Sequence, residues 1–352
     1  MNPRMTLKIY PRPDTFYRGK SSLNFDAMRS KILLDRSNQG ELYLWIAHIF
    51  CGVFVALLTF LLITCEDKLI EFRTHFVQNL IDRHENSIAY IWYAGSAIIL
   101  VTFAVLLTVY IGPGATGSGV VEVMGLLNGV NYPDAIGFKT LFVKVVGLTF
   151  AISSGLCIGK EGPLVHIGAI LGVITCYLPF RSFKYLQNDV YKRQMMACGS
   201  GCGVAVAFGA PIGGALFIYE ISKPNTFWTF SMLWRVFAAT SISTFVLSVL
   251  ESLSTNGPLS LSDSGSLKLG NLSLGNENSI LDLPAGIILG VICGLLGALF
   301  IWVSIALGMW RKKNINTPIK KVIEAIFFAF ITASSFYLIV WLWRGSCVSI
   351  LS

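Results

Sequence analysis

The sequence has little charge. Only 13% of its 352 residues are Asp, Glu, Lys or Arg, whereas 54% are hydrophobic. A soluble domain usually carries about 25% charged residues, so this composition excludes an ordinary soluble protein. The formal net charge of +8 fits basic loops beside a membrane rather than a nucleic-acid interface. We therefore expect an all-α integral membrane protein with the lipid bilayer as a partner and no nucleic-acid partner.

Patterns typical of metal sites and enzymes are also absent. The eight cysteines fall mostly inside apolar runs, and no Cys-x-x-Cys pair or Cys/His ligand spacing is present. Cysteines in such runs are usually small buried hydrophobic side chains. The sequence likewise contains no recognisable set of nucleophile and base. It therefore predicts no metal, no cofactor and no enzymatic activity.

What the sequence does contain is a series of long uncharged runs. A helix needs about 20 predominantly apolar residues to cross a bilayer. Five runs approach this length: Tyr43–Cys65, Ile88–Gly112, Phe227–Leu250, Leu283–Trp310 and Val322–Trp343. Three further runs are shorter or rich in glycine, and we expect tilted, broken or re-entrant helices there: Leu141–Ile158, Leu164–Phe180 and Met195–Tyr219.

The polar segments between these runs suggest a topology. Residues 1–40 lack the short apolar core of a signal peptide, which indicates a cytosolic tail. The basic segments Arg181–Arg193 and Arg311–Lys321 are also expected in the cytosol. The segment 251–281 is nearly free of Lys and Arg and contains a sequon at Asn271, so it should face the lumen or exterior. The predicted parts are a tail (1–40), a first set of membrane helices (41–250), a luminal or extracellular loop (251–281) and the start of a second set (282–352).

The segment Gly159–Pro163 (Gly-Lys-Glu-Gly-Pro) places a carboxylate between two apolar runs. Burying a carboxylate in a membrane is costly, so such a residue usually has a function. Glycine on either side of the Lys-Glu pair allows a sharp turn, and Pro163 suits the first turn of a helix. We expect a helix to start here with Glu161 at its mouth. The alternative is a loop in which Glu161 pairs with Lys160 at the membrane surface.

Two other glycine-rich segments, Gly112–Gly119 and Gly199–Gly214, interrupt or adjoin apolar runs. The N-terminal ends of broken helices offer free N–H groups and partial positive charge, which suits a small anion. Ser118 would add a hydroxyl donor, although a lone serine there could equally be a helix cap. Lys144, inside an apolar run, would either extend its amine to the interface or supply positive potential near a pore.

Glycines in membrane helices also serve close packing. This alternative is favoured for Gly199–Gly203 and for the spacing Gly290-x-x-x-Gly294-x-x-Gly297.

Three motifs taken together resemble the CLC family of voltage-gated chloride channels and chloride/proton exchangers. They are Gly117-Ser118-Gly119 with Glu122-Val123, then Gly159–Pro163, then Ala207–Phe217, in the family's order and spacing. The resemblance covers residues 40–345 and is strongest to the endosomal/lysosomal branch. It implies a multi-pass all-α fold with broken and tilted helices in two inverted halves, usually assembled as a homodimer. It also implies an intracellular membrane, with the plasma membrane as the alternative.

The resemblance assigns roles to particular residues. Ser118 would coordinate chloride, and Glu161 would be the gating carboxylate that competes with anions for their site. Protonating Glu161 would remove the competitor, so pH should act on gating. The implied anion-binding set is Gly117, Ser118, Gly119, Gly159, Lys160 and Gly162.

The sequence departs from the family pattern in three ways. Val120-Val121 stand where Ile-Pro is usual, which would loosen the helix start. Ile221 occupies the position of the exchangers' second glutamate, the internal proton acceptor, and an isoleucine relays no protons. This favours a channel or an uncoupled transporter. The alternative is an antiporter that uses a different internal acceptor.

The third departure is length. We expect the first half of the fold and about two helices of the second, without the cytosolic CBS domains. A further alternative is therefore a truncated, non-conducting partner that assembles with full-length family members and regulates them.

Overall fold

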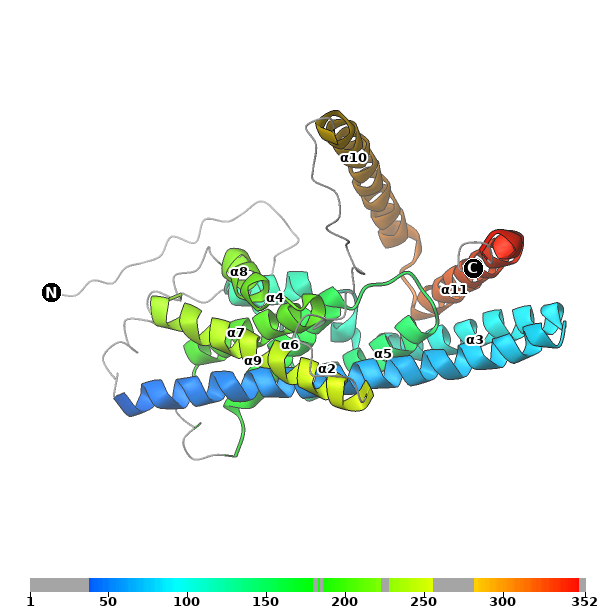
Figure 1. The fold of residues 1–352 in the computed structure, drawn as a ribbon. Coiled ribbons are helices and arrows are strands. Elements are labelled where there is room, and N and C mark those ends of the chain that lie inside the picture. The colour runs from blue at the N-terminus through cyan, green and yellow to red at the C-terminus, as the bar shows by residue number, and fades with distance from the viewer. Residues whose placement is uncertain (1–37, 180–182, 184–185, 223–227, 256–281, 348–352) are drawn as a thin grey trace.

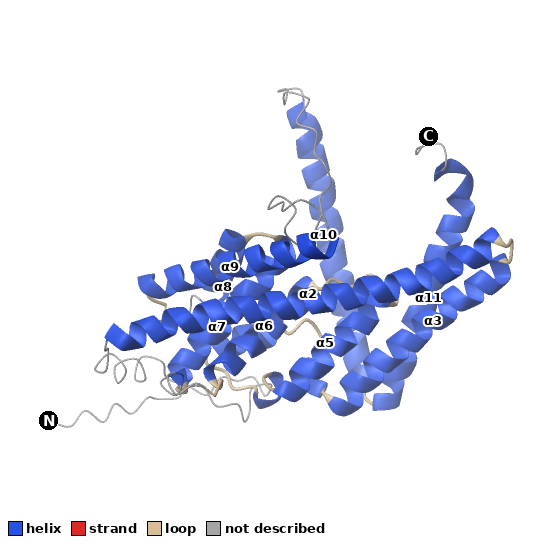
Figure 2. Ribbon diagram, turned by 60° about the horizontal axis from the view of Figure 1, so that its bottom comes forward, coloured by secondary structure: helices blue, strands red, loops and turns tan. Residues whose placement is uncertain are grey.

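The computed structural model describes residues 38–179, 183, 186–222, 228–255 and 282–347, and every regular element among them is helical (Figure 2). The ten α-helices among the described residues are α2 (Asn38–Asp82), α3 (Asn86–Leu106), α4 (Val120–Leu127), α5 (Phe138–Ser153), α6 (Glu161–Cys176), α7 (Asp189–Phe208), α8 (Pro211–Ser222), α9 (Phe230–Thr255), α10 (Asp282–Asn314) and α11 (Pro318–Cys347). A π-helical turn, η3 (Leu107–Ile111), follows α3 directly. Single 3₁₀ turns lie at η4 (Pro113–Ala115) and η5 (Pro133–Ala135).

A long antiparallel hairpin of α2 and α3 forms one side of the molecule (Figure 1). The 45 residues of α2 extend over about 67 Å at 1.5 Å per residue. The hydrocarbon core of a bilayer is only about 30 Å thick, so the polar second half of α2 extends beyond it. Near the turn, the rings of Phe76 and Trp92 stack with centroids 4.3 Å apart.

The centre of the bundle is a backbone-to-backbone contact between α6 and α7. A Cβ atom added to Gly168 would overlap the carbonyl of Gly199, and one added to Gly199 would overlap the carbonyl of Gly168. Gly203 meets the backbone at Leu164 in the same way. Small residues let membrane helices approach this closely, so the packing role expected for Gly199–Gly203 is confirmed. Around this contact, α2, α4, α8 and α9 complete the main apolar core.

The last two helices are packed differently from the rest. Tyr90 on α3 and Ser334 on α11 share a hydrogen bond of 2.8 Å between their hydroxyls, which joins these helices side by side. In contrast, α10 stands away from the bundle (Figure 1), and no part of its apolar span is buried. No described atom lies within 4 Å of the Cβ positions of Gly290, Gly294 or Gly297. Their expected packing partner is therefore not among the described residues.

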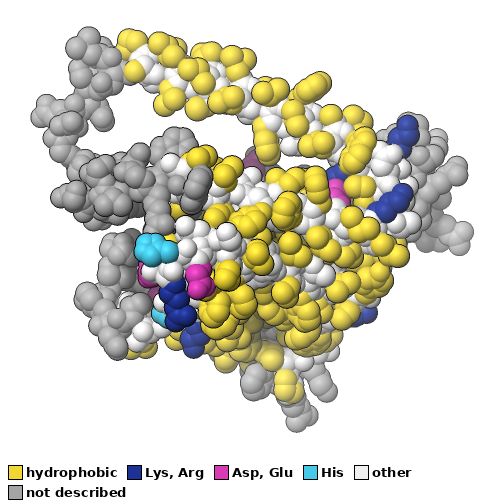
Figure 3. Space-filling view, turned by 90° about the vertical axis from the view of Figure 1, so that its right-hand side faces the viewer, with side chains coloured by type: hydrophobic (Ala, Val, Ile, Leu, Met, Phe, Trp, Pro, Cys, Tyr) yellow, Lys and Arg dark blue, Asp and Glu magenta, His cyan; other side chains and the backbone are white. Residues whose placement is uncertain are grey.

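The helices agree with the predicted runs. Among the described residues, five helices are long and apolar enough to cross a membrane: Gly40–Asp82, Asn86–Ile111, Phe230–Ser254, Leu283–Asn314 and Pro318–Val340. The glycine-rich run Met195–Tyr219 is broken, as expected, because Gly209 takes a left-handed conformation (φ 64°) between α7 and α8. Apolar side chains cover most of the face in Figure 3, and the charged ones visible there form small groups. The fold is that of an all-α, integral multi-pass membrane protein.

Some predicted parts fall partly outside the described residues. The tail 1–40 overlaps the structure only where α2 begins, at Asn38. α9 extends to Thr255, and the rest of the loop 251–281, including Asn271, lies outside the described residues.

The α6–α7 contact gives a first prediction. Gly168→Leu should destabilise the protein by at least the roughly 1–3 kcal/mol of an overpacked core, because the new side chain would enter the backbone of α7. The measurement is the apparent melting temperature in detergent. Gly290→Leu on α10 is the matched control, since its Cβ position has no neighbour within 4 Å among the described residues. Equal melting temperatures for the two variants would contradict the packing described here.

Candidate anion site

Ser118 lies in a short connection that turns sharply into α4. Gly117 (φ 72°) and Gly119 (φ 83°) on either side of it both take positive φ values. Residues other than glycine rarely adopt these φ values, so this turn requires glycine at both positions. The Ser118 hydroxyl is exposed, and among the described residues its one hydrogen bond is a long contact of 3.4 Å from the N–H of Val120. A strong helix cap is therefore not its role, and its hydroxyl is available for a ligand.

Glu161 is the first residue of α6, and Lys160 is its N-cap. The helix start predicted from the glycines and Pro163 is therefore confirmed. The half-buried Glu161 side chain folds back over Gly159, where an added Cβ would overlap its Oε2 atom. A carboxylate at this end of a helix is stabilised by the partial positive charge of the first turn.

The structure brings the two segments together. A Cβ atom on Gly162, in the first turn of α6, would lie 2.8 Å from the Cβ of Ser118. Next to this contact lies a cavity of about 320 Å³. Its lining includes Gly117, Ser118, Lys144, Gly159 and Pro163. The N-terminal ends of α4 and α6 thus meet beside one cavity, and such ends favour anions.

Lys144 on α5 contributes a positive charge to this cavity. Its amine donates hydrogen bonds to the carbonyls of Gly117 (2.6 Å) and Ala115 (3.1 Å), and the residue is 4% exposed. It does not extend to the interface, so that expectation was wrong. The alternative expectation of a positive charge near a pore fits its place in the cavity lining.

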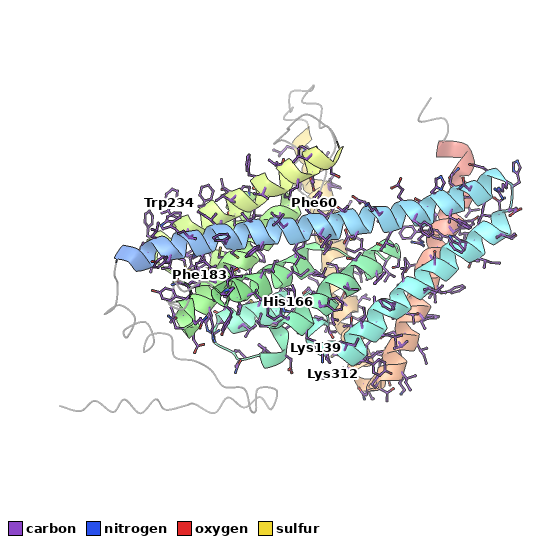
Figure 4. All side chains as sticks on the ribbon, turned by 90° about the horizontal axis from the view of Figure 1, so that it is seen from below. Phe60, Lys139, His166, Phe183, Trp234 and Lys312 are labelled. Atoms are coloured by element: carbon purple, nitrogen blue, oxygen red, sulfur yellow. The ribbon has the colours of Figure 1, made fainter. Side chains whose placement is uncertain are left out.

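His166 supports the loop from behind. It is fully buried among the helices (Figure 4), and its Nε2–H donates to the Ala135 carbonyl at 2.7 Å. Its Nδ1 atom lies where the Cβ of any larger residue at position 119 would be. The imidazole therefore fills the space that Gly119 leaves and fixes the start of α4.

Lys160 points away from Glu161. Its amine forms an ion pair of 3.1 Å with the buried carboxylate of Glu66 on α2. The alternative pairing of Lys160 with Glu161 is therefore not seen, and Lys160 does not line the cavity. Of the other members of the expected anion-binding set, Gly117, Ser118 and Gly159 line the cavity, and Gly119 and Gly162 do not.

The third motif and Ile221 lie elsewhere. Ala207–Phe217 forms the end of α7, the break at Gly209 and the start of α8. Ile221, in the last turn of α8, packs its half-buried side chain against the main core. Its carbonyl accepts a hydrogen bond of 3.0 Å from the Asn128 side chain. No residue of the third motif, and not Ile221, lines the cavity beside Ser118.

Sequence reasoning did not single out two charged residues that support this site, Glu66 and Arg73. His166 was expected to be either interfacial or packed, and it is packed. Glu66 and Arg73 belong to a charged stretch that reads as a solvated end of a helix, so only their spacing of seven residues could have suggested a common face. In the part of the chain that the structure describes, no group of three His, Cys, Asp or Glu side chains could hold a metal ion.

Broken helices that meet beside a charged cavity within an apolar bundle define a multi-pass membrane protein with an internal polar site. Comparison with models of protein families identifies the family of this membrane protein. The model of the voltage gated chloride channel family matches residues 97–346, and the chain belongs to that family.

Two curated relatives illustrate the similarity. Chloride channel protein D of Dictyostelium discoideum is 34% identical over 291 residues, which cover 78% of this chain and 28% of that protein. H(+)/Cl(-) exchange transporter 7 of Bos taurus is 29% identical over 354 residues, covering 93% of this chain and 44% of that protein. The chain thus spans less than half the length of these relatives.

Solved structures share the fold. A eukaryotic CLC transporter gives a TM-score of 0.67 at 24% identity, covering 85% of this chain and 50% of that one. A slow cyanobacterial Cl-/H+ antiporter gives a TM-score of 0.66 at 19% identity, covering 85% of this chain and 64% of that one. The expected CLC-type fold is therefore confirmed.

The contacts of Lys144 yield a second prediction. Lys144→Met should lower the apparent melting temperature, because two carbonyls in the Ser118 turn lose their donor at a typical cost of about 1–3 kcal/mol each. Lys139→Met on the same helix is the control, since Lys139 is exposed (Figure 4). A melting temperature as high as that of the control would show that the amine does not hold the turn.

Proposed function

We propose that the chain moves chloride passively across an intracellular membrane, with Ser118 as an anion ligand and Glu161 as the gating carboxylate. The observation that carries this proposal is the meeting of the Ser118 turn and the start of α6 beside one cavity. Family membership makes chloride the anion to test first. Similarity to exchange transporter 7 supports an endosomal or lysosomal membrane, and the family's usual assembly supports a homodimer.

The chemistry follows from the groups around the cavity. N–H groups at the starts of α4 and α6, the Ser118 hydroxyl and the Lys144 amine all attract a small anion. Because Lys144 is already bonded to two carbonyls, its charge acts through space rather than as a tight ion pair. Conduction requires such moderate binding, since an ion held too strongly would not leave.

Glu161 competes with chloride in this scheme. Its carboxylate is an anion tethered at the N-terminal end of α6, where it folds back over Gly159 in the cavity lining. Protonation removes its charge and frees the site. Chloride flux should therefore rise as the pH falls.

Ile221 favours passive rather than proton-coupled movement. It has no ionisable group at the position where exchangers carry their internal glutamate. The neighbouring Glu220 lies about 100° further round α8, so it is a poor substitute. The competing proposal is an antiporter with another internal acceptor.

A second candidate function has its own observation. The isolation of α10, none of whose span is buried among the described residues, would suit a chain that packs against further helices of a longer family member. In that case the chain would regulate full-length subunits and would not conduct alone.

Reconstitution separates these functions. Purified chain in chloride-loaded liposomes should release chloride when a potassium ionophore balances charge, and an imposed proton gradient alone should drive no chloride movement. Chloride movement driven by protons would support the antiporter. Release only after co-reconstitution with a full-length family member would support the regulatory partner.

The gating role gives a third prediction. Glu161→Ala should give chloride release that is fast and independent of pH, because the competing carboxylate is gone. The measurement is the initial rate of release between pH 4.5 and 7.5. Glu71→Ala, an exposed acid on α2, should keep the rise towards low pH. A pH response that survives in Glu161→Ala would rule out this role.

A further inference from the structure

The segment Ser154–Lys160, which leads into Glu161, has no regular helix of its own. It lies between the end of α5 and the start of α6. Its position therefore depends on side-chain contacts from neighbouring helices. The structure shows such a contact at each end, and both come from α2.

At the C-terminal end of this segment, Lys160 forms an ion pair with Glu66. The Glu66 side chain is 3% exposed, and its Oε2 atom lies 3.1 Å from the Lys160 amine. Its Oε1 atom is buried and has no hydrogen-bond partner among the described residues. Lys160 is thus the cation that compensates this carboxylate, and a buried carboxylate without its partner is strongly unfavourable.

At the N-terminal end of the segment, Arg73 on α2 binds the last turn of α5. Its guanidinium donates to the carbonyl of Ser153 (3.1 Å), the carbonyl of Tyr93 (3.0 Å) and the hydroxyl of Ser96 (3.0 Å). It also lies 4.1 Å above the Tyr93 ring. A cation is favoured at the C-terminal end of a helix, here α5, and over an aromatic face.

The chain direction changes directly after this contact. Gly155 has a φ of 84°, and a Cβ there would lie only 3.1 Å from the Arg73 guanidinium. Arg73 therefore packs directly against the turn that begins the connection.

Glu66 and Arg73 are seven residues apart, so they lie on one face of α2, about 10 Å from each other along its axis. We propose that this face of α2 is a clamp that fixes both ends of Ser154–Lys160 and thereby sets the position of the Glu161 carboxylate. Glu66 and Arg73 are positioning residues that act through the connection. This inference rests on the proposed gating role of Glu161, which directly follows the clamped Lys160 in the chain.

Cys157, in the middle of the connection, offers a direct test. It is exposed, whereas Cys51, Cys176, Cys198 and Cys202 are buried. With the remaining cysteines (65, 293 and 347) changed to serine, a nitroxide attached to Cys157 in the full chain in lipid nanodiscs reports the mobility of the connection.

Glu66→Gln, Arg73→Gln and Lys160→Gln should each raise the ratio of mobile to immobile label about tenfold, the change that corresponds to about 1.4 kcal/mol. The controls should leave the spectrum unchanged: Glu71→Gln alters an exposed residue of α2, and Arg83→Gln alters an exposed residue in the turn just after it. The double variant Glu66→Gln/Lys160→Gln should add nothing to the effect of Glu66→Gln, because both changes act on the same contact.

General destabilisation is distinguished by the apparent melting temperature in detergent. For each variant it should stay well above the temperature at which the label is measured. If Arg73→Gln does not fold, Arg73→Lys keeps the charge but cannot make all three contacts, and it should also release the label. An immobile label at Cys157 in the Glu66 and Arg73 variants would overturn the clamp.

Flux measurements connect the clamp with gating. If Glu161 gates, Glu66→Gln should shift the pH of half-maximal chloride release, whereas Glu71→Gln should not. If the unaltered chain releases no chloride, the proposed function fails while the label still decides on the clamp. A released label together with an unshifted pH profile would overturn the link between the clamp and Glu161.

Discussion

The contact between α6 and α7 is the constraint on which the rest of the structure depends. Glycines on both helices let their backbones touch, which fixes the axis of α6 within the bundle. Because Glu161 is the first residue of α6, its position relative to the membrane follows from that packing. The Ser118 turn is then placed by Gly162 and His166, both on α6. One helix thus carries the carboxylate and also supports the segment opposite it.

Residue pattern alone predicted much of this arrangement. The apolar runs gave the spanning helices, and glycine with proline marked the helix start at Glu161 and the break at Gly209. The proximity of Ser118 to Gly162 could not be predicted from spacing, because no periodicity links residues on separate broken helices. It followed only from the family resemblance. Lys144 was ambiguous, since one lysine in an apolar run looks the same whether its amine extends to the interface or binds carbonyls inside.

The support of the site by α2 had no clear signal in the sequence. Glu66 and Arg73 lie in a stretch with several charged residues, and such stretches are usually solvated helix surface. Their burial depends on partners far along the chain, at Lys160, Ser153 and Tyr93. In a bundle of this kind, the polar residues that matter most are those whose partner lies on a different helix.

The Glu66–Lys160 pair also sets an order of events during synthesis. The two residues are 94 positions apart, so at about 5–20 residues per second the ribosome makes Lys160 roughly 5–20 s after Glu66. During that interval the nascent α2 carries an uncompensated carboxylate at the end of its apolar segment. Glu66 can therefore gain its partner within the bundle only after the segment before α6 has emerged.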